Sequence, residues 1–362
     1  MLVWRMRLGL LLPLLILCGC GQCSAPAEPV DPDVAAIDAA LERGTRFLLD
    51  AQSEDGAWRS TTYGAFKDGY SLTPMVLASL MFAPEVEGRA VAYARGVDFA
   101  ATVVVGDKLA AGFDAPSYPV YTAALTAVVL SAPQNRRHLP ARDVLVRELR
   151  GLQLPTGGWG YTSRSRAAAN LSSTLWAVGA LRLAGVPGDD ADIARARGFV
   201  ERCQNHPGDG GFFHSPDLPD SNKAGEDGGR PRSYGSMTAD GVRALARVDG
   251  DADRSAAAVA WLSERFDPER NPGVFPEQDE VRRASAYYYW VWSASHAMLL
   301  SGQSGWARPL ARAVVGRQDD DGGWRNGYTE MREDDALVAT SMAMAALSVA
   351  RYRITGTWTA RR

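Results

Sequence analysis

Asp240 lies in a segment, Tyr234–Asp240, whose small and apolar residues are typical of a buried helix. A buried carboxyl group needs a hydrogen-bonding partner or a cavity. Ser236 precedes Asp240 by one helical turn, so the hydroxyl and the carboxyl are expected on one face of the helix. Two interpretations follow. Either a Ser236–Asp240 hydrogen bond merely satisfies a buried acid, or both groups face a cavity where Asp240 transfers protons or pairs with a charge.

A second acidic group, Arg332-Glu333-Asp334-Asp335, comes directly before the last apolar segment of the chain. Carboxyl groups held protonated by burial and by one another can donate protons to a substrate, which makes Asp334 and Asp335 catalytic candidates. Arg332 is expected to favour the ionised form of its neighbours instead. The acids also have a structural interpretation, because negative side chains in a first helical turn complement the helix dipole.

The remaining chemistry-bearing residues favour a ligand cavity rather than a metal centre. Cys203 is the only cysteine beyond residue 23, and neither it nor His296 has partners at the spacing of a zinc site, so no metal and no cofactor are predicted. Aromatic and polar residues instead gather at the starts of several apolar segments. The candidates for lining a cavity are Tyr121, Asn170, Tyr234, Ser236, Tyr289, Trp292 and His296.

The N-terminus has the pattern of an export signal. Two arginines precede the apolar run Leu8–Leu17, which is too short for the ~20 residues of a membrane-spanning helix. Leu17-Cys18-Gly19-Cys20 resembles the lipobox of bacterial lipoproteins, with Cys20 as the lipidated residue and Cys18 as the weaker choice. The prediction is a signal peptide at 1–19, a flexible tether at 20–33 and an exported protein with a lipid anchor in a bacterial membrane. A plain secretory signal is the alternative.

The rest of the chain repeats itself about every 50 residues. The pattern Gln-x3-Gly-x-Trp occurs three times, and looser copies end at Phe113, Phe212 and Phe275. The three complete copies contribute the following Gln and Trp residues: Gln52, Trp58, Gln153, Trp159, Gln318 and Trp324.

A second series, Ser/Thr-x6-Leu/Val, alternates with the glycine motifs. Its copies lie in segments rich in Ala, Leu and Met without interior proline, which favours helices buried on all sides. In the first copy, Thr73 is expected to cap a helix before Pro74. The segments before the glycine motifs, such as Val34–Leu49, are amphipathic. Six inner and six outer helices therefore predict an all-α (α/α)6 toroid in which residues 34–362 form one domain.

The glycine motif, preceded by an aromatic–Leu pair, resembles the repeat of squalene–hopene cyclases, oxidosqualene cyclases and protein prenyltransferase β subunits. The resemblance covers almost the whole chain after the tether. It implies an α/α toroid with a cavity lined by inner helices, and structural roles for the motif Gln and Trp residues. It also implies an Asp-x-Asp-Asp acid or a zinc site, but Arg332 replaces the first aspartate and the zinc ligands are missing.

Three functions of different classes remain open. The first is binding or processing of a small-molecule or lipid-like ligand in the central cavity, which includes a non-catalytic binding protein. The second is a cyclase-like isomerase that uses Asp240 or Asp334/Asp335, and the third is a carbohydrate-active enzyme, which needs two facing carboxylates. The insertion 213–233 would form either a rim over the cavity or a solvated loop. The net charge of −3 argues against nucleic acid as a partner, and the sequence leaves protein partners open.

Overall fold

The computed structural model describes residues 31–110, 118–161 and 168–359. The predicted signal peptide, Cys20 and most of the predicted tether lie outside these ranges. Pro32–Arg362 form one compact unit. Its first helix begins at Pro32, before the expected start at residue 34. Proline suits a first helical turn, and Asp33 forms ion pairs with Arg308 and Arg312.

Helices make up most of this unit. The outer helices are α1 (Pro32–Asp50), α3 (Arg89–Ala101), α5 (Leu139–Gly151), α7 (Ala191–Arg202), α9 (Ala252–Arg265) and α12 (Ala307–Val315). The inner helices are α2 (Thr73–Leu80), α4 (Pro119–Leu130), α6 (Leu171–Leu183), α8 (Gly235–Arg247), α11 (Tyr287–Leu300) and α13 (Ala336–Thr355). The remaining elements are short: α10 (Glu280–Ala284), the 3-10 helices Gly64–Phe66, Pro133–His138, Pro219–Ser221 and Glu277–Asp279, and the antiparallel pairs β1–β2 (Val104–Val105, Lys108–Leu109) and β3–β4 (Glu226–Asp227, Arg230–Pro231).

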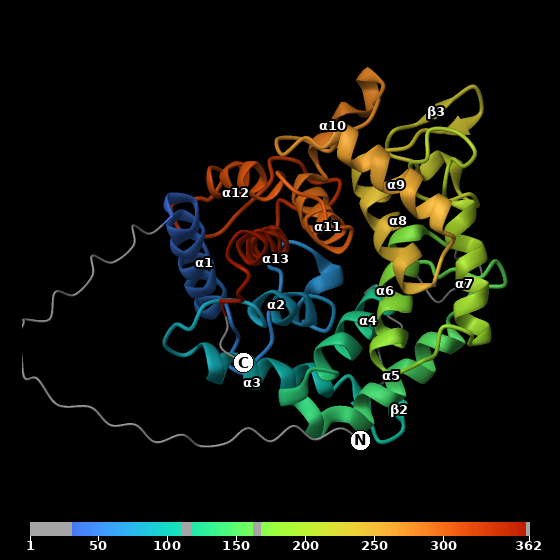
Figure 1. Cartoon of the computed structure of the whole chain (residues 1–362). Coiled ribbons are helices and arrows are strands. Elements are labelled where there is room, and N and C mark those ends of the chain that lie inside the picture. The colour runs from blue at the N-terminus through green and yellow to red at the C-terminus, as the bar shows by residue number, and fades with distance from the viewer. Residues whose placement is uncertain (1–30, 111–117, 162–167, 360–362) are drawn as a thin grey trace, which may run out of the picture. The chain divides into compact units, whose positions relative to one another are not determined.

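The inner helices form a closed ring. Each packs against the next in the order α2, α4, α6, α8, α11 and α13, and α13 packs against α2. The outer helices surround this ring and pack against their inner neighbours (Figure 1). The helical toroid predicted from the sequence is confirmed.

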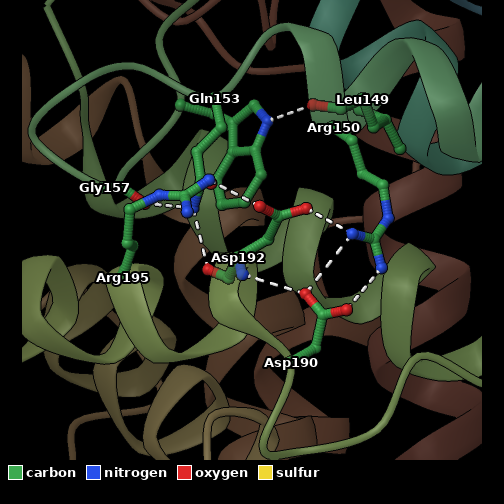
Figure 2. Close-up of polar contacts among 8 residues, drawn as sticks. Leu149, Arg150, Gln153, Gly157, Asp190, Asp192 and Arg195 are labelled. Atoms are coloured by element: carbon green, nitrogen blue, oxygen red, sulfur yellow. Dashed lines mark hydrogen bonds and ion pairs between the residues drawn. The ribbon is translucent and has the colours of Figure 1, made fainter.

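Four of the six joints between successive outer helices are held by the glutamine of a glycine motif. The Gln153 side-chain amide donates to the carbonyls of Gly157, in its own turn, and of Asp192, at the start of the next outer helix, at 2.8 Å each (Figure 2). Gln52, Gln204 and Gln318 make the same pair of bonds to their own turns and to the following outer helices. The last of them reaches Ala40 on α1, so this joint links the end of the chain to its beginning.

The motif tryptophan and glycine fix the same turn from inside. The Trp159 indole is fully buried and donates to the Leu149 carbonyl at 2.7 Å. Gly157 has φ +91°, and a Cβ there would lie 2.3 Å from the carbonyl oxygen of Arg195 on the next outer helix, so only glycine fits. Trp58 and Trp324 make the equivalent indole bonds.

The threonines of the second series connect the motif turns to the inner helices. The hydroxyls of Thr73, Thr174 and Thr340 accept hydrogen bonds from the backbone N–H groups of Trp58, Trp159 and Trp324 at 2.9–3.0 Å. Thr73 is thus the first residue of α2 rather than its cap, because its hydroxyl serves the preceding turn.

None of the described helices is both long enough and apolar enough to cross a membrane.

Candidate functional site

A cavity of about 320 Å³ opens at the N-terminal ends of the inner helices. Every inner helix contributes to its wall: Met75 (α2), Tyr121 and Leu125 (α4), Ser172 (α6), Ser236 and Met237 (α8), Tyr289 (α11), and Val338 and Met342 (α13). The central cavity is therefore a product of ring closure.

Loops complete the wall above the helices. They contribute Phe66, Ser71, Tyr118, Tyr161, His214, Lys223, Ala286, Glu330, Met331 and Arg332. Lys223 and His214 belong to the insertion 213–233, which thus forms part of the rim, one of the two roles predicted for it. The opposite side of the insertion, Arg230–Ser233, lines a cleft of about 710 Å³ outside the ring, against α9 and the segment around Val274.

Aromatic rings form one continuous side of the cavity. The Tyr121 and Tyr161 rings stack with 6.1 Å between their centres, and the Tyr161 and His214 rings stack at 6.0 Å. The His214 ring nitrogens lie 3.1 Å from the Tyr161 hydroxyl and 2.8 Å from the Ser221 hydroxyl. Burial lowers the pKa of His214 to about 3, so its imidazole is neutral at physiological pH.

Asp240 lies beneath the floor of the cavity and is fully buried. Its Oδ2 accepts hydrogen bonds from the hydroxyls of Tyr289, at 2.6 Å, and Ser172, at 3.2 Å, and both donors line the cavity. The Tyr121 hydroxyl donates to Ser172 at 2.6 Å. A chain of hydroxyl groups therefore connects Asp240 to the cavity surface.

The other oxygen of Asp240 faces a buried arginine. Oδ1 accepts a hydrogen bond from Ser293 and lies 3.5 Å from Nη1 of Arg243, whose side chain is 3% exposed. Burial raises the pKa of Asp240, and the Arg243 guanidinium opposes that shift. Arg243 also lies over the Trp176 ring, 5.1 Å from its centre. Arg243 and the three hydroxyl groups favour an ionised, paired carboxylate.

Ser236 does not bond Asp240 as one interpretation expected. The Ser236 hydroxyl accepts a hydrogen bond from Asn271 at 3.1 Å, and Asn271 also accepts from the Ser236 backbone N–H at 2.9 Å. Both Ser236 and Asp240 are on the inner side of α8, but Asp240 finds its partners on α6 and α11 instead.

The second acidic group is divided among different partners. Glu333 is fully buried and accepts hydrogen bonds from the backbone N–H groups of Tyr288 and Tyr289 at the start of α11. Burial raises the pKa of Glu333 to about 7. Asp335 caps α13 by accepting from the Leu337 N–H at 3.0 Å.

Asp334 accepts a hydrogen bond from the Tyr63 hydroxyl at 2.6 Å. Neither Asp334 nor Asp335 lines the central cavity. Arg332, expected to keep the acids ionised, makes no ion pair with Glu333, Asp334 or Asp335 in the described structure, and it lines the cavity itself.

Of the predicted cavity residues, Tyr121, Ser236 and Tyr289 reach the wall. The others serve the surrounding packing. Asn170 caps α6, and Tyr234 packs edge-on against Phe275.

Trp292 stacks on Trp176 with 4.9 Å between ring centres. Nδ1 of His296 lies 2.9 Å from the Trp292 carbonyl oxygen. Cys203 is buried at the end of α7, and the described residues contain no cluster of three His, Cys, Asp or Glu side chains that could hold a metal ion.

Sequence reasoning missed Tyr161, His214, Lys223 and Arg332 as wall residues. Tyr161 follows a motif tryptophan by two positions, and that spacing was the only signal available. Lys223 and His214 lie in the insertion, where no periodic pattern of apolar residues indicates which side chains face the cavity. The sequence indicates an effect of Arg332 on the neighbouring acids, but nothing in it shows that the Arg332 side chain lines the cavity.

No protein-family model matches this chain, and a search of curated proteins also finds no match. Solved structures do match. A variant of the type II terpene cyclase MstE from Scytonema, in complex with its product merosterolic acid A, aligns with TM-score 0.60 and 14% identity over 89% of this chain and 99% of that one. A protein from Actinoplanes aligns with TM-score 0.59 and 18% identity over 87% and 99% of the two chains.

A glycosidase variant in complex with glucose aligns with TM-score 0.55 and 14% identity, over 89% of this chain and 99% of that chain. At such identities these likenesses show the fold: a helical toroid similar to that of terpenoid cyclases. Because the same toroid carries a terpene cyclase and a glycosidase, function must be argued from the cavity.

Proposed function

We propose that this protein binds a small, largely apolar organic molecule in its central cavity, outside the cytoplasm and tethered to a membrane by lipid on Cys20. One observation carries the binding role. Side chains of all six described inner helices surround a cavity whose wall is mostly aromatic, methionine and aliphatic, with hydroxyl groups at its floor. A concave apolar wall with a few convergent polar groups is the usual form of a small-molecule site. The lipobox supports the location.

The test is a calorimetric titration of the full chain with 4-butylbenzyl alcohol, an uncharged probe with an apolar body. Injection of the probe into protein-free buffer gives the background heat. Met75→Trp replaces a flexible thioether side chain with a bulky indole ring at a half-buried position of the wall. We expect this variant to bind the probe about tenfold more weakly, or worse, because the added ring occupies the cavity. Val274→Trp is the matched control, since Val274 is 70% exposed and lies outside the ring. Equal binding by the two variants would contradict the proposal.

A second candidate is acid catalysis by Asp240, as in a cyclase-like isomerase. The chain of hydroxyls from Asp240 through Tyr289 and Ser172 favours it, because it offers a path for a proton to the cavity. Arg243 disfavours it, since a nearby guanidinium stabilises the carboxylate that has already lost its proton. The structure supports a carbohydrate-active enzyme less well, because glycoside hydrolysis needs two facing carboxyl groups and only Glu330 supplies one among the described wall residues.

A further inference from the structure

Arg332 lines the central cavity, and its guanidinium forms no ion pair with any described residue. Its Nη1 is buried and has no hydrogen-bond partner in the described structure. The guanidinium carbon lies 5.0 Å from the ring centre of Tyr118, 5.2 Å from that of Tyr63 and 5.4 Å from that of Phe66. The rings attract the charge but accept no hydrogen bonds in the guanidinium plane, so the planar donors remain available to a ligand.

The backbone at Arg332 is held in a costly conformation. Its φ is +60°, in the left-handed region that residues with a side chain rarely adopt. On its C-terminal side, Glu333 is fixed by the start of α11 and Asp335 caps α13. The turn therefore aims Arg332 at the cavity at a cost in free energy. Such strain at a cavity wall favours a role in ligand recognition over a role in packing.

Lys223 brings a second cation to the same cavity from the insertion 213–233. No ion pair of Lys223 is found among the described residues, and burial lowers its pKa to about 8. Glu330, the described wall residue with a carboxyl group, is exposed and pairs with neither cation. The rim of the cavity therefore carries an excess of positive charge, although the whole chain is negative.

We propose that the ligand of the central cavity carries an oxyanion, a carboxylate or a phosphate, which Arg332 and Lys223 bind at the rim while the apolar body enters the ring. This inference rests on the proposed function and specifies its ligand class. Guanidinium donors match the geometry of both kinds of oxyanion, and hydrogen bonds between charged groups are stronger than neutral ones.

The floor of the cavity fixes the orientation of such a ligand. Asp240 lies directly beneath it, and its negative charge disfavours an anion at that end. The apolar body instead meets the Met75 and Met342 side chains and the aromatic wall. The anionic group therefore stays at the rim and the apolar group lies deeper in the ring.

The test compares three probes with the same apolar body on the full chain by calorimetry: 4-butylbenzoate, 4-butylphenyl phosphate and the neutral 4-butylbenzyl alcohol. We expect at least one anion to bind the wild-type protein about tenfold more tightly than the alcohol, and the tighter anion identifies the headgroup. Arg332→Met should remove this preference, measured as the ratio of anion affinity to alcohol affinity in the same variant, and Lys223→Met should reduce that ratio. Arg332→Lys should keep part of it. Arg230→Met, in the outer cleft, is the control and should keep the full preference.

An unchanged helical signal of Arg332→Met in circular dichroism shows that the variant is folded. The inference is overturned if the wild-type protein binds the alcohol as tightly as both anions, or if Arg332→Met keeps the preference. If the wild-type protein binds none of the three probes, the proposed function fails as well. The two failures are therefore distinguishable.

Discussion

Replacing Asp240 with asparagine removes the counter-charge of a buried arginine. The Asp240 carboxylate is fully buried and lies 3.5 Å from the Arg243 guanidinium, whose side chain is 3% exposed and whose Nε has no hydrogen-bond partner in the described structure. In Asp240→Asn, Arg243 keeps the hydrogen bond to Ser293 but faces no negative charge. The amide also places an N–H₂ donor where hydroxyl groups now donate.

The expected loss in the free energy of unfolding is about 3–5 kcal/mol, the cost of leaving one member of a buried ion pair uncompensated. Arg243→Met should cost a similar amount, because it leaves the carboxylate without its partner. The double variant Asp240→Asn/Arg243→Met removes both charges. We expect the double variant to lose at least about 2 kcal/mol less of the free energy of unfolding than the two single variants lose together. The reason is that the double variant retains no buried unpaired charge.

Guanidinium chloride unfolding of the four proteins at pH 7, followed by circular dichroism, measures these differences. A loss of no more than about 1 kcal/mol for Asp240→Asn, with additive effects of the two single variants, would contradict a buried ion pair between Asp240 and Arg243. Asp240 would then be protonated at neutral pH, and the second candidate, acid catalysis, would replace the interpretation of Asp240 as a paired carboxylate that positions the Tyr289 and Ser172 hydroxyls.

Trp159→Ala should lower the free energy of unfolding by about 3–5 kcal/mol, because it leaves a cavity at a buried joint and removes the indole hydrogen bond to Leu149. Denaturant unfolding should remain one cooperative transition. A melting temperature close to that of the wild type would argue against this structural role. Burial raises the pKa of Glu333 to about 7 in the folded protein, against 4.5 for the ordinary carboxyl group. The folded state therefore binds this proton more tightly than the unfolded state, and the free energy of unfolding should fall by about 3 kcal/mol as the pH rises from 4.5 to 7. Glu333→Gln should lack this fall, and an unchanged profile in denaturant titrations would exclude Glu333 as its source. Cys20→Ala should appear in the soluble fraction or as an unprocessed precursor on cell fractionation, whereas normal maturation at the membrane would exclude the lipobox assignment.

The ring was predictable from sequence because its joints repeat. A glutamine, a glycine and a tryptophan recur at fixed spacing, and the glutamine makes the same pair of backbone bonds wherever the motif is complete, as Gln153 and Gln318 show. The closing bond from Gln318 to Ala40 follows from that periodicity once the ring is known. The start of α1 at Pro32 was less predictable, because Asp33 forms its ion pairs with α12, which is far away in the sequence.

The cavity wall was less predictable, because the inner helices other than α8 are apolar on all sides, and no apolar stripe indicates which of their side chains face the cavity. Tyr289 and Trp292 stand on the same helix, yet Tyr289 lines the cavity while Trp292 stacks on Trp176 of α6. Asp240 was identified by its isolation among apolar residues, but its partners on α6 and α11 depend on how the helices meet. The positive φ of Arg332 accompanies the bonds of the next residue, Glu333, to the start of α11, which the sequence does not show.

Native mass spectrometry of the full chain, purified from the cells that make it, tests whether the central cavity holds a ligand. We expect the wild-type protein and Val274→Trp each to carry one noncovalent molecule, and Met75→Trp, with an indole ring in the central cavity, to carry none. A wild-type protein without a bound molecule, or the same bound mass in Met75→Trp, would contradict the claim that this toroid binds a small molecule at its centre.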